Sequence, residues 1–146
     1  MVGAPYESRR RSLLTIVRFQ RIPEVVSIPG KGRGVIAKCS FEPRDVIEKC
    51  PLVFLREEEE AAFVKQHGVL WYYAIDLTAV GRTALHLGLG MLYNHSSTPN
   101  SEIVYQAGDD FLLFVATSRI LPGEEIVYDY EFEGEPEYLP QGGEIA

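Results

Sequence analysis

The chain has 146 residues, 46% of them hydrophobic, and a formal net charge of −7 at pH 7. This length suits one domain with a real core and is too short for two full-sized ones, while no apolar run approaches the roughly 20 residues that a membrane span needs. The two cysteines, Cys39 and Cys50, and three scattered histidines lack the paired spacings of a structural zinc site, so we expect no metal and two reduced, buried thiols.

The charge is unevenly distributed along the chain. Residues 1–21 carry five arginines against one glutamate, whereas residues 124–146 carry eight acidic residues and no lysine or arginine. An acidic end disfavours binding to a nucleic-acid backbone and favours a cationic partner. A solvated acidic tail that keeps the protein soluble explains the same pattern.

The first elements are expected to be short strands. Residues 13–19 and 25–28 are aliphatic and β-branched runs separated by a proline, which predicts two strands or one extended lead-in. Three glycines within residues 30–34 allow a sharp turn and a close approach of a ligand to the backbone before residues 35–36 resume a strand. The pattern lacks the spacing of nucleotide-binding glycine motifs, so a phosphate cradle is not expected.

The middle of the chain contains the clearest helix. Residues 41–45 predict a turn, and residues 46–55 predict one strand or two strands joined at Pro51. Residues 57–67 begin with four glutamates and end with Lys65 and His67, charges that match the dipole of a helix at both ends. The helix dipole accounts for the four glutamates, so there is no need to assign them to a metal site.

The second half predicts further short strands. Residues 71–77 are aromatic and β-rich and predict a strand, whereas residues 84–93 predict a short helix or a tight turn. Residues 101–105 and 111–117 flank a Gly-Asp turn and predict a hairpin. Many short strands with one convincing helix indicate a mainly β fold of small curved sheets.

Three separated segments resemble the SET-domain protein lysine methyltransferases. KGRGVIA at residues 31–37 is similar to the family's Gly-x-Gly motif, and YNHSSTPN at residues 93–100 is similar to its Asn-His-Ser-Cys-x-Pro-Asn signature. GEEIVYDY at residues 123–130 is similar to its Glu-Leu-x-Phe-Asp-Tyr signature. The three stand in the family's order.

The resemblance covers roughly residues 22–131 and implies the SET (β-clip) fold, in which the last segment passes beneath a loop as a C-terminal pseudoknot. On this reading residues 1–21 are a basic lead-in, residues 22–131 are the SET domain, and residues 132–146 are an acidic tail or lid.

The resemblance also implies a reaction, the transfer of a methyl group from S-adenosylmethionine to the side-chain amine of a lysine. The sulfonium methyl is already electrophilic, so the protein has to place a neutral amine in line with it and exclude water. An aromatic channel helps because free lysine has a pKa near 10.4 and burial disfavours its charged form. The alternative is a catalytically silent SET-like module that binds peptides.

Carried over position by position, the resemblance assigns cofactor contacts to Lys31, Gly32, Arg33, Gly34, Asn94 and His95. Tyr130 matches the family's near-invariant tyrosine beside the transferring methyl, and is implied to be catalytic and to contact the cofactor. Tyr128 stands where members carry Phe or Tyr, and its hydroxyl can hold a water or the amine, which favours mono- or dimethylation. Tyr72 or Tyr73 lines the lysine channel; alternation along a strand allows only one of them to do so, and Tyr73 is favoured.

One departure from the family pattern concerns zinc. Ser97 stands where many members have a zinc-binding cysteine, and no Cys-x-Cys follows Tyr130. Without a zinc-bound segment, the acidic tail is expected to cover the site, with Phe132 or Tyr138 as the covering residue.

The expected partner is a basic protein or peptide that contains lysine, such as a histone tail, with no direct binding to nucleic acid or membranes. The acidic end would steer this substrate, so salt should weaken its binding. We expect an intracellular protein, nuclear if its source is eukaryotic or viral and cytoplasmic if bacterial.

Overall fold

A computed structural model describes residues 21–66, 68–78 and 80–130. The predicted strand at residues 13–19 and the predicted lid at residues 132–146, with Phe132 and Tyr138, lie outside the described residues, as does His67. Among the described residues, no helix combines the length and the apolar character needed to cross a membrane.

The first two strands, β1 (Glu24–Ile28) and β2 (Gly32–Ile36), form an antiparallel hairpin. The turn between them depends on glycine, because Gly30 and Gly32 have φ angles of 78° and 85°, which other residues rarely adopt. The predicted strand at residues 25–28 is confirmed. The second strand begins at Gly32, earlier than predicted, so most of the glycine motif is itself paired with β1.

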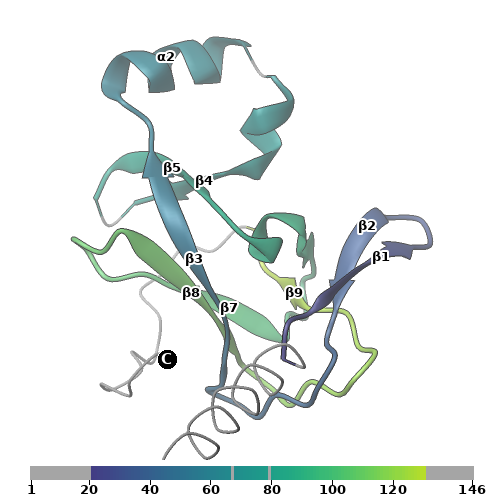
Figure 1. Ribbon diagram of the computed structural model, residues 1–146. Helices are drawn as coiled ribbons and strands as arrows, with labels where there is room; N and C mark the ends of the chain where they lie inside the picture. The colour runs from purple at the N-terminus through teal and green to yellow at the C-terminus, as the bar shows by residue number, and fades with distance from the viewer. Residues whose placement is uncertain (1–20, 67, 79, 131–146) are drawn as a thin grey trace, which may run out of the picture.

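A five-stranded antiparallel sheet in the order β4-β5-β3-β8-β7 forms the centre of the molecule (Figure 1). The predicted hairpin of residues 101–105 and 111–117 is confirmed as the outer pair, β7 and β8. The strands of the sheet are β3 (Val46–Phe54), β4 (Ala74–Leu77), β5 (Arg82–His86), β7 (Ser101–Val104) and β8 (Phe111–Ala116).

Strand β3 changes its partner at Pro51. Residues 46–51 pair with β8, and residues 52–54 pair with β5. Proline has no N–H to donate to a ladder and is tolerated where the pairing changes, while the carbonyl oxygen of Pro51 accepts a hydrogen bond from Leu87 N at 2.8 Å. Of the two possibilities that the sequence leaves open, the structure has one continuous strand, which joins the two halves of the sheet.

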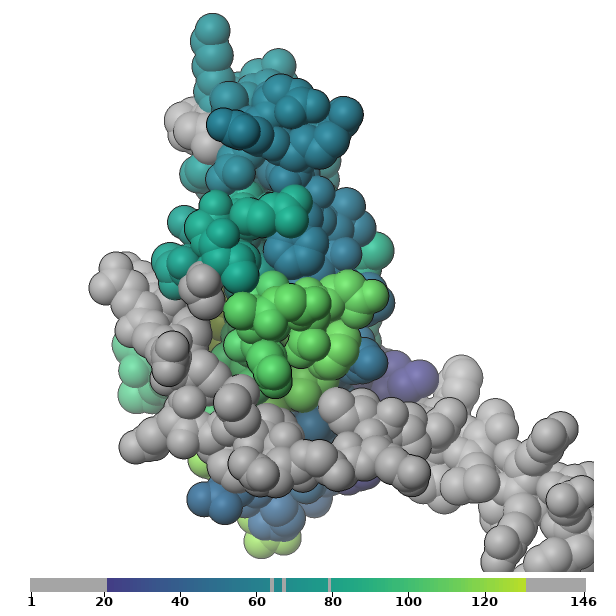
Figure 2. All heavy atoms as spheres, turned by 90° about the vertical axis from the view of Figure 1, so that its left-hand side faces the viewer, coloured from purple at the N-terminus to yellow at the C-terminus, as the bar shows by residue number. Residues whose placement is uncertain are grey.

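Helix α2 (Glu57–Gln66) confirms the predicted helix, with four glutamates in its first turn. Figure 2 looks at the side away from the β1–β2 hairpin and shows α2 above the green β7–β8 hairpin. The strand predicted at residues 71–77 is wrong over its first three residues, which belong to the 3₁₀ helix η1 (Val69–Tyr73). Packing overrides β propensity here, because Trp71 packs on Phe63 of α2 with ring centroids 5.8 Å apart.

The segment predicted as a short helix or turn at residues 84–93 is divided between two elements. The 3₁₀ helix η2 (Leu89–Leu92) confirms the helical part, but the first three residues belong to β5. They form a strand because β5 pairs with β3 on one side and β4 on the other, which no local pattern reveals.

The last strand completes the fold by running between two distant segments. Strand β9 (Val127–Tyr128) pairs in parallel with β6 (Asn94–His95). Just before it, Ile126 N donates to Val35 O of β2 at 2.8 Å. In Figure 1, β9 lies between the β1–β2 hairpin and the central sheet. The predicted mainly β fold of small sheets, with a C-terminal pseudoknot and one short α-helix in the described part of the chain, is confirmed.

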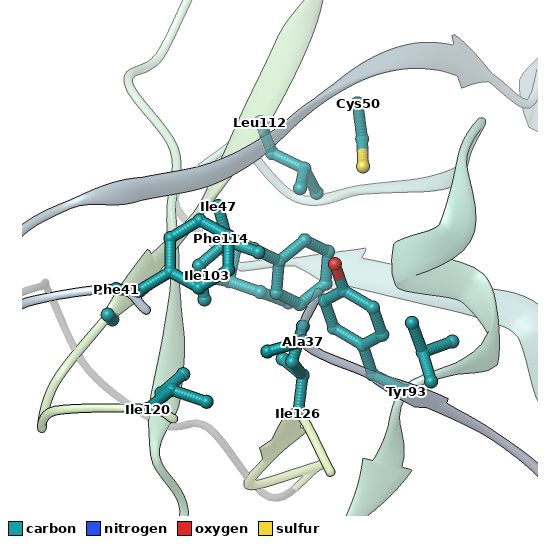
Figure 3. Close-up of a cluster of buried hydrophobic side chains, with 12 residues drawn as sticks. Ala37, Phe41, Ile47, Cys50, Tyr93, Ile103, Leu112, Phe114, Ile120 and Ile126 are labelled. Carbon is teal, nitrogen blue, oxygen red and sulfur yellow. The ribbon is translucent and has the colours of Figure 1, made fainter. Parts of the chain in front are cut away.

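The core lies directly beneath the segment that leads into β6. Figure 3 shows Phe114 next to Tyr93, and their ring centroids are 4.8 Å apart. Both side chains are fully buried, together with Phe41 and Ile126. A Cβ atom at Gly90 would overlap the ring of Phe114, so glycine lets η2 pack directly on the core.

We predict that His86 makes the protein less stable in acid. His86 is 2% exposed, and burial lowers its pKa from the ordinary 6.5 to about 4. The unfolded chain therefore binds the proton more readily than the folded protein does. The contribution of neutral His86 to stability is complete above pH 6.5 and is lost as the pH falls towards 4. The loss amounts to at most about 3 kcal/mol.

Urea titrations at pH 7 and pH 4.5 measure this loss. The free energy of unfolding should fall further between the two pH values in the wild type than in His86→Leu. Comparing each variant with itself removes the packing cost of the substitution. Equal falls in the two proteins would contradict the prediction.

Candidate functional site

Three segments that are far apart in the sequence meet beside the β1–β2 hairpin. Asn94 pairs with Val127 and His95 pairs with Tyr128, which joins β6 to β9. Strand β2 is bonded to the chain just before β9. The residues of all three sequence motifs are thereby brought to one place.

Asn94 lies at the centre of this site. Its side-chain amide nitrogen donates to Arg33 O at 2.9 Å and to Glu125 Oε1 at 2.7 Å. The other carboxylate oxygen of Glu125 accepts from Lys31 Nζ at 2.8 Å. The resemblance assigns cofactor contacts to Lys31, Arg33 and Asn94 but gives no role to Glu125, although Glu125 is the first residue of the third signature. The position of Glu125 in that signature is the sequence signal that distinguishes it from Glu124.

Gly34 and Gly32 are required for different reasons. A Cβ atom at Gly34 would lie 2.5 Å from Ile28 Cγ1 and 2.8 Å from both Asn94 Nδ2 and Glu125 Oε1. No side chain fits there without displacing this cluster. At Gly32 a Cβ atom would meet open space, and the requirement is its positive φ.

Tyr130 is bonded to the segment that carries Asn94. Its hydroxyl donates to Tyr93 O at 2.7 Å, and its backbone N–H donates to His95 Nδ1 at 3.2 Å. Burial, followed by the nearby Tyr73 and Glu125, raises the pKa of Tyr130. The side chain is therefore neutral at physiological pH. With its proton committed to a carbonyl, the hydroxyl oxygen keeps lone pairs for another donor.

Tyr128 connects Tyr130 to the core. Its ring centroid lies 4.8 Å from that of Tyr130 and 5.2 Å from that of Phe114. Burial is the largest cause of the raised pKa of Tyr128, with smaller contributions from Tyr130 and Cys50. The phenol is consequently a neutral hydrogen-bonding group at the base of an aromatic cluster.

Of the two tyrosines in η1, Tyr73 and not Tyr72 is turned towards the site. The Tyr73 hydroxyl accepts a hydrogen bond from the Arg33 guanidinium at 3.1 Å, whereas Tyr72 is 80% exposed. Strand alternation does not decide between them, because both lie in a 3₁₀ helix. The contact joins the glycine motif in β2 to the segment around η1.

A half-buried carboxylate that the motifs do not include supports the site from the core side. Glu48 of β3 accepts hydrogen bonds from Leu89 N and Gly90 N, both at 2.8 Å, and from the Tyr93 hydroxyl at 3.1 Å. These bonds satisfy the first N–H groups of η2 and hold the chain just before Asn94. The sequence offers little signal for such a role, because Lys49 follows Glu48 and the two together resemble the exposed charges of a strand.

Ser97 lies away from this network, whereas Cys50 adjoins it beside Glu48 and Gly90. Ser97 is exposed in the loop after β6. Cys39 and Cys50 are free thiols, but only Cys50 is buried as predicted, and Cys39 is half-buried. Burial raises the pKa of Cys50 to about 12. Within the described ranges, no three side chains of metal-ligating type lie close enough to hold an ion.

Comparison with known proteins identifies a family. The family model for the SET domain matches residues 32–131. Human histone-lysine N-methyltransferase 2B is 27% identical over 107 residues, which are 69% of this chain and 4% of the human protein. The H3 lysine-37-specific histone-lysine N-methyltransferase of Schizosaccharomyces pombe is 29% identical over 110 residues, which are 73% of this chain and 71% of the yeast protein.

A solved structure gives the same result for the fold. The crystal structure of a Plasmodium falciparum protein, assigned provisionally as a histone methyltransferase, superposes with a TM-score of 0.60 and 26% sequence identity. The match covers 78% of this chain and 96% of that one. The chain therefore spans a small part of the human relative and most of the yeast and Plasmodium ones.

We predict that Asn100 is required to hold the threaded segment. Its Nδ2 donates to Glu125 O at 2.8 Å, and its Oδ1 accepts from Val127 N at 3.0 Å. Asn100→Ala leaves both backbone groups unpaired, so the free energy of unfolding should fall by about 2 to 4 kcal/mol in a urea titration.

Ser101→Ala is the matched control, because it removes a single bond to Val127 O, at 2.9 Å. Its cost should be about 1 kcal/mol. An Asn100→Ala protein as stable as the Ser101→Ala protein would contradict this role for Asn100.

Proposed function

Because this chain belongs to the SET domain family, we propose that it transfers a methyl group from S-adenosylmethionine to the side-chain amine of a lysine in a basic protein or peptide. One observation carries the proposal. The Tyr130 hydroxyl is bonded to the carbonyl of Tyr93, next in sequence to Asn94, whose amide lies against β2. Tyr130, which is suited to orienting an amine, is thus anchored on the residue next to Asn94, which is suited to holding a cofactor.

The residues present fit S-adenosylmethionine, which supplies an electrophilic methyl group on a sulfonium. A Cβ atom at Gly32 would meet open space, so the backbone there is accessible to a ligand, while Gly34 lets Asn94 and Glu125 pack against β2. Asn94 offers its amide oxygen, and Tyr130 is 55% exposed and accessible. The residues proposed to hold the cofactor are Lys31, Gly32, Arg33, Gly34, Asn94, His95 and Tyr130.

Tyr130 orients the substrate amine and does not remove its proton. Its raised pKa keeps the phenol neutral, and its own proton is donated to Tyr93 O. A lone pair on the hydroxyl oxygen accepts an N–H of the amine and directs the nitrogen lone pair towards the methyl. The lysine loses its proton to solvent as it enters, because burial among Tyr73, Tyr128 and Tyr130 disfavours the ammonium form.

The substrate class follows from the relatives and from charge. The human and yeast relatives are histone-lysine methyltransferases by name, and this chain is acidic overall, which suits a basic tail such as that of a histone. In a eukaryotic or viral setting the protein would act in the nucleus. Residues 22–131 form the SET domain of this proposal, with residues 1–21 and 132–146 flanking it.

The direct test is incubation with isotopically labelled S-adenosylmethionine and a panel of lysine-containing basic peptides, followed by mass spectrometry. The wild type should methylate at least one peptide. Tyr130→Phe should lower kcat by roughly a hundredfold and leave the Kd for S-adenosylmethionine within about threefold, since the hydroxyl acts only during transfer.

Tyr72→Phe is the matched control for this substitution, because Tyr72 is exposed, and it should retain the wild-type rate. A wild-type protein that binds peptide and cofactor without transferring the methyl group would indicate the silent binding module instead.

We also predict that Tyr128 limits the number of methyl groups added. Its hydroxyl can hold a water or the amine and so restrict the space for a larger product. Tyr128→Phe should shift the products from mono- and dimethyl-lysine towards trimethyl-lysine, as read from peptide masses. Tyr105→Phe, a tyrosine that packs on the core, should leave the products unchanged. An unaltered product ratio in Tyr128→Phe would refute this role.

A further inference from the structure

The orientation of the Asn94 side chain follows from the chemistry of its neighbours. An amide has two N–H donors and one carbonyl acceptor. Its two partners are Arg33 O at 2.9 Å and Glu125 Oε1 at 2.7 Å. A backbone carbonyl and an ionised carboxylate can only accept, so the amide nitrogen must face both of them.

This orientation leaves the carbonyl oxygen of Asn94 free. Among the described residues no hydrogen bond to Asn94 Oδ1 is present, and Asn94 is half-buried, so its carbonyl oxygen has capacity for a further donor. A carbonyl oxygen attracts an ammonium group, whereas the N–H end of a flipped amide would repel it. The orientation thus decides whether Asn94 attracts or repels a cationic amine.

Glu125 is itself held in place from several sides. Its second oxygen, Oε2, accepts from Lys31 Nζ at 2.8 Å, and its backbone carbonyl accepts from Asn100 Nδ2 at 2.8 Å. The side chain is 19% exposed, and the absence of a side chain at Gly34 leaves room for its contact with Asn94. Lys31 partly neutralises its charge, so what Glu125 provides to Asn94 is chiefly a fixed acceptor.

From these contacts we infer that Glu125 is a positioning residue for the cofactor: it holds the Asn94 amide so that Oδ1 meets the α-amino group of the methionine part of S-adenosylmethionine. The inference rests on the proposed function and gives a role to Glu125, the glutamate of the third signature, to which the resemblance alone assigned none. Removing the carboxylate leaves Asn94 with Arg33 O as its single fixed partner, and the amide can then rotate or flip.

The test uses two ligands that differ only in the amino group. S-adenosylhomocysteine carries it, and 5′-S-(3-carboxypropyl)-5′-thioadenosine lacks it. Isothermal titration calorimetry of the full chain gives the ratio of the two dissociation constants, which is the amine preference. The wild type should prefer the amine-bearing ligand by about tenfold or more, since hydrogen bonds to charged groups are among the stronger ones.

Glu125→Ala should lose most of this preference, and so should Asn94→Ala. Glu125→Gln should keep most of it, because the glutamine carbonyl can still accept from Asn94 Nδ2. Glu124→Ala is the matched control: it removes the neighbouring carboxylate, which bonds Leu121 N, and should leave the preference intact. In the double variant Asn94→Ala/Glu125→Ala the preference should fall no lower than in Asn94→Ala.

Three results would overturn the inference. If Glu125→Ala and Glu125→Gln weaken both ligands equally, Glu125 serves only the fold. If the double variant loses more preference than Asn94→Ala, Glu125 contacts the amine itself. If the wild type binds neither ligand, the proposed function fails and the inference fails with it. In the first two cases the wild type still binds, so the two failures are distinguishable.

Discussion

The parallel pairing of β6 with β9 is the interaction on which the site depends. It is only two residues long on each side, so it adds little stability by itself. It is held instead by side chains that bond to backbone, above all Asn100 to Glu125 O and Val127 N, and Ser101 to Val127 O. These side-chain to backbone hydrogen bonds fix the path of β9, so that the Tyr130 hydroxyl reaches Tyr93 O. Without it, the aromatic residues at the end of the domain would have no fixed relation to β2.

Two carboxylates support the site from opposite sides of Tyr93. Glu48, half-buried on the core side, accepts three hydrogen bonds from the chain before Asn94, and Glu125 accepts from Asn94 and Lys31. A carboxylate removed from water is costly unless its oxygens are bonded, and here both oxygens of each are. The segment that carries Asn94 is thereby held by Glu48 on the core side and by Glu125 on the side of β2, which gives a fixed frame to residues that we propose hold the cofactor.

Local patterns predict the elements whose stability is local. The helix at residues 57–66 follows from its terminal charges, and the β7–β8 hairpin follows from two β-rich runs around a turn. The errors occur where a distant partner decides. Residues 71–73 have a strong β propensity but form part of η1, whose Trp71 packs on the helix. Residues 84–86 look like part of a compact turn but are paired on both sides in the sheet.

The sequence by itself determined the family motifs, their order, the mainly β character and the short list of residues around Gly34, Asn94 and Tyr130, because glycine conformations, turns and periodicity are properties of neighbouring residues. Only the tertiary structure decided that Tyr73 and not Tyr72 meets Arg33, and that Glu125 reaches Asn94 across 31 positions of sequence. These contacts depend on how the last strand runs between β2 and β6. That path is set by long-range hydrogen bonds and core packing, which no local propensity encodes.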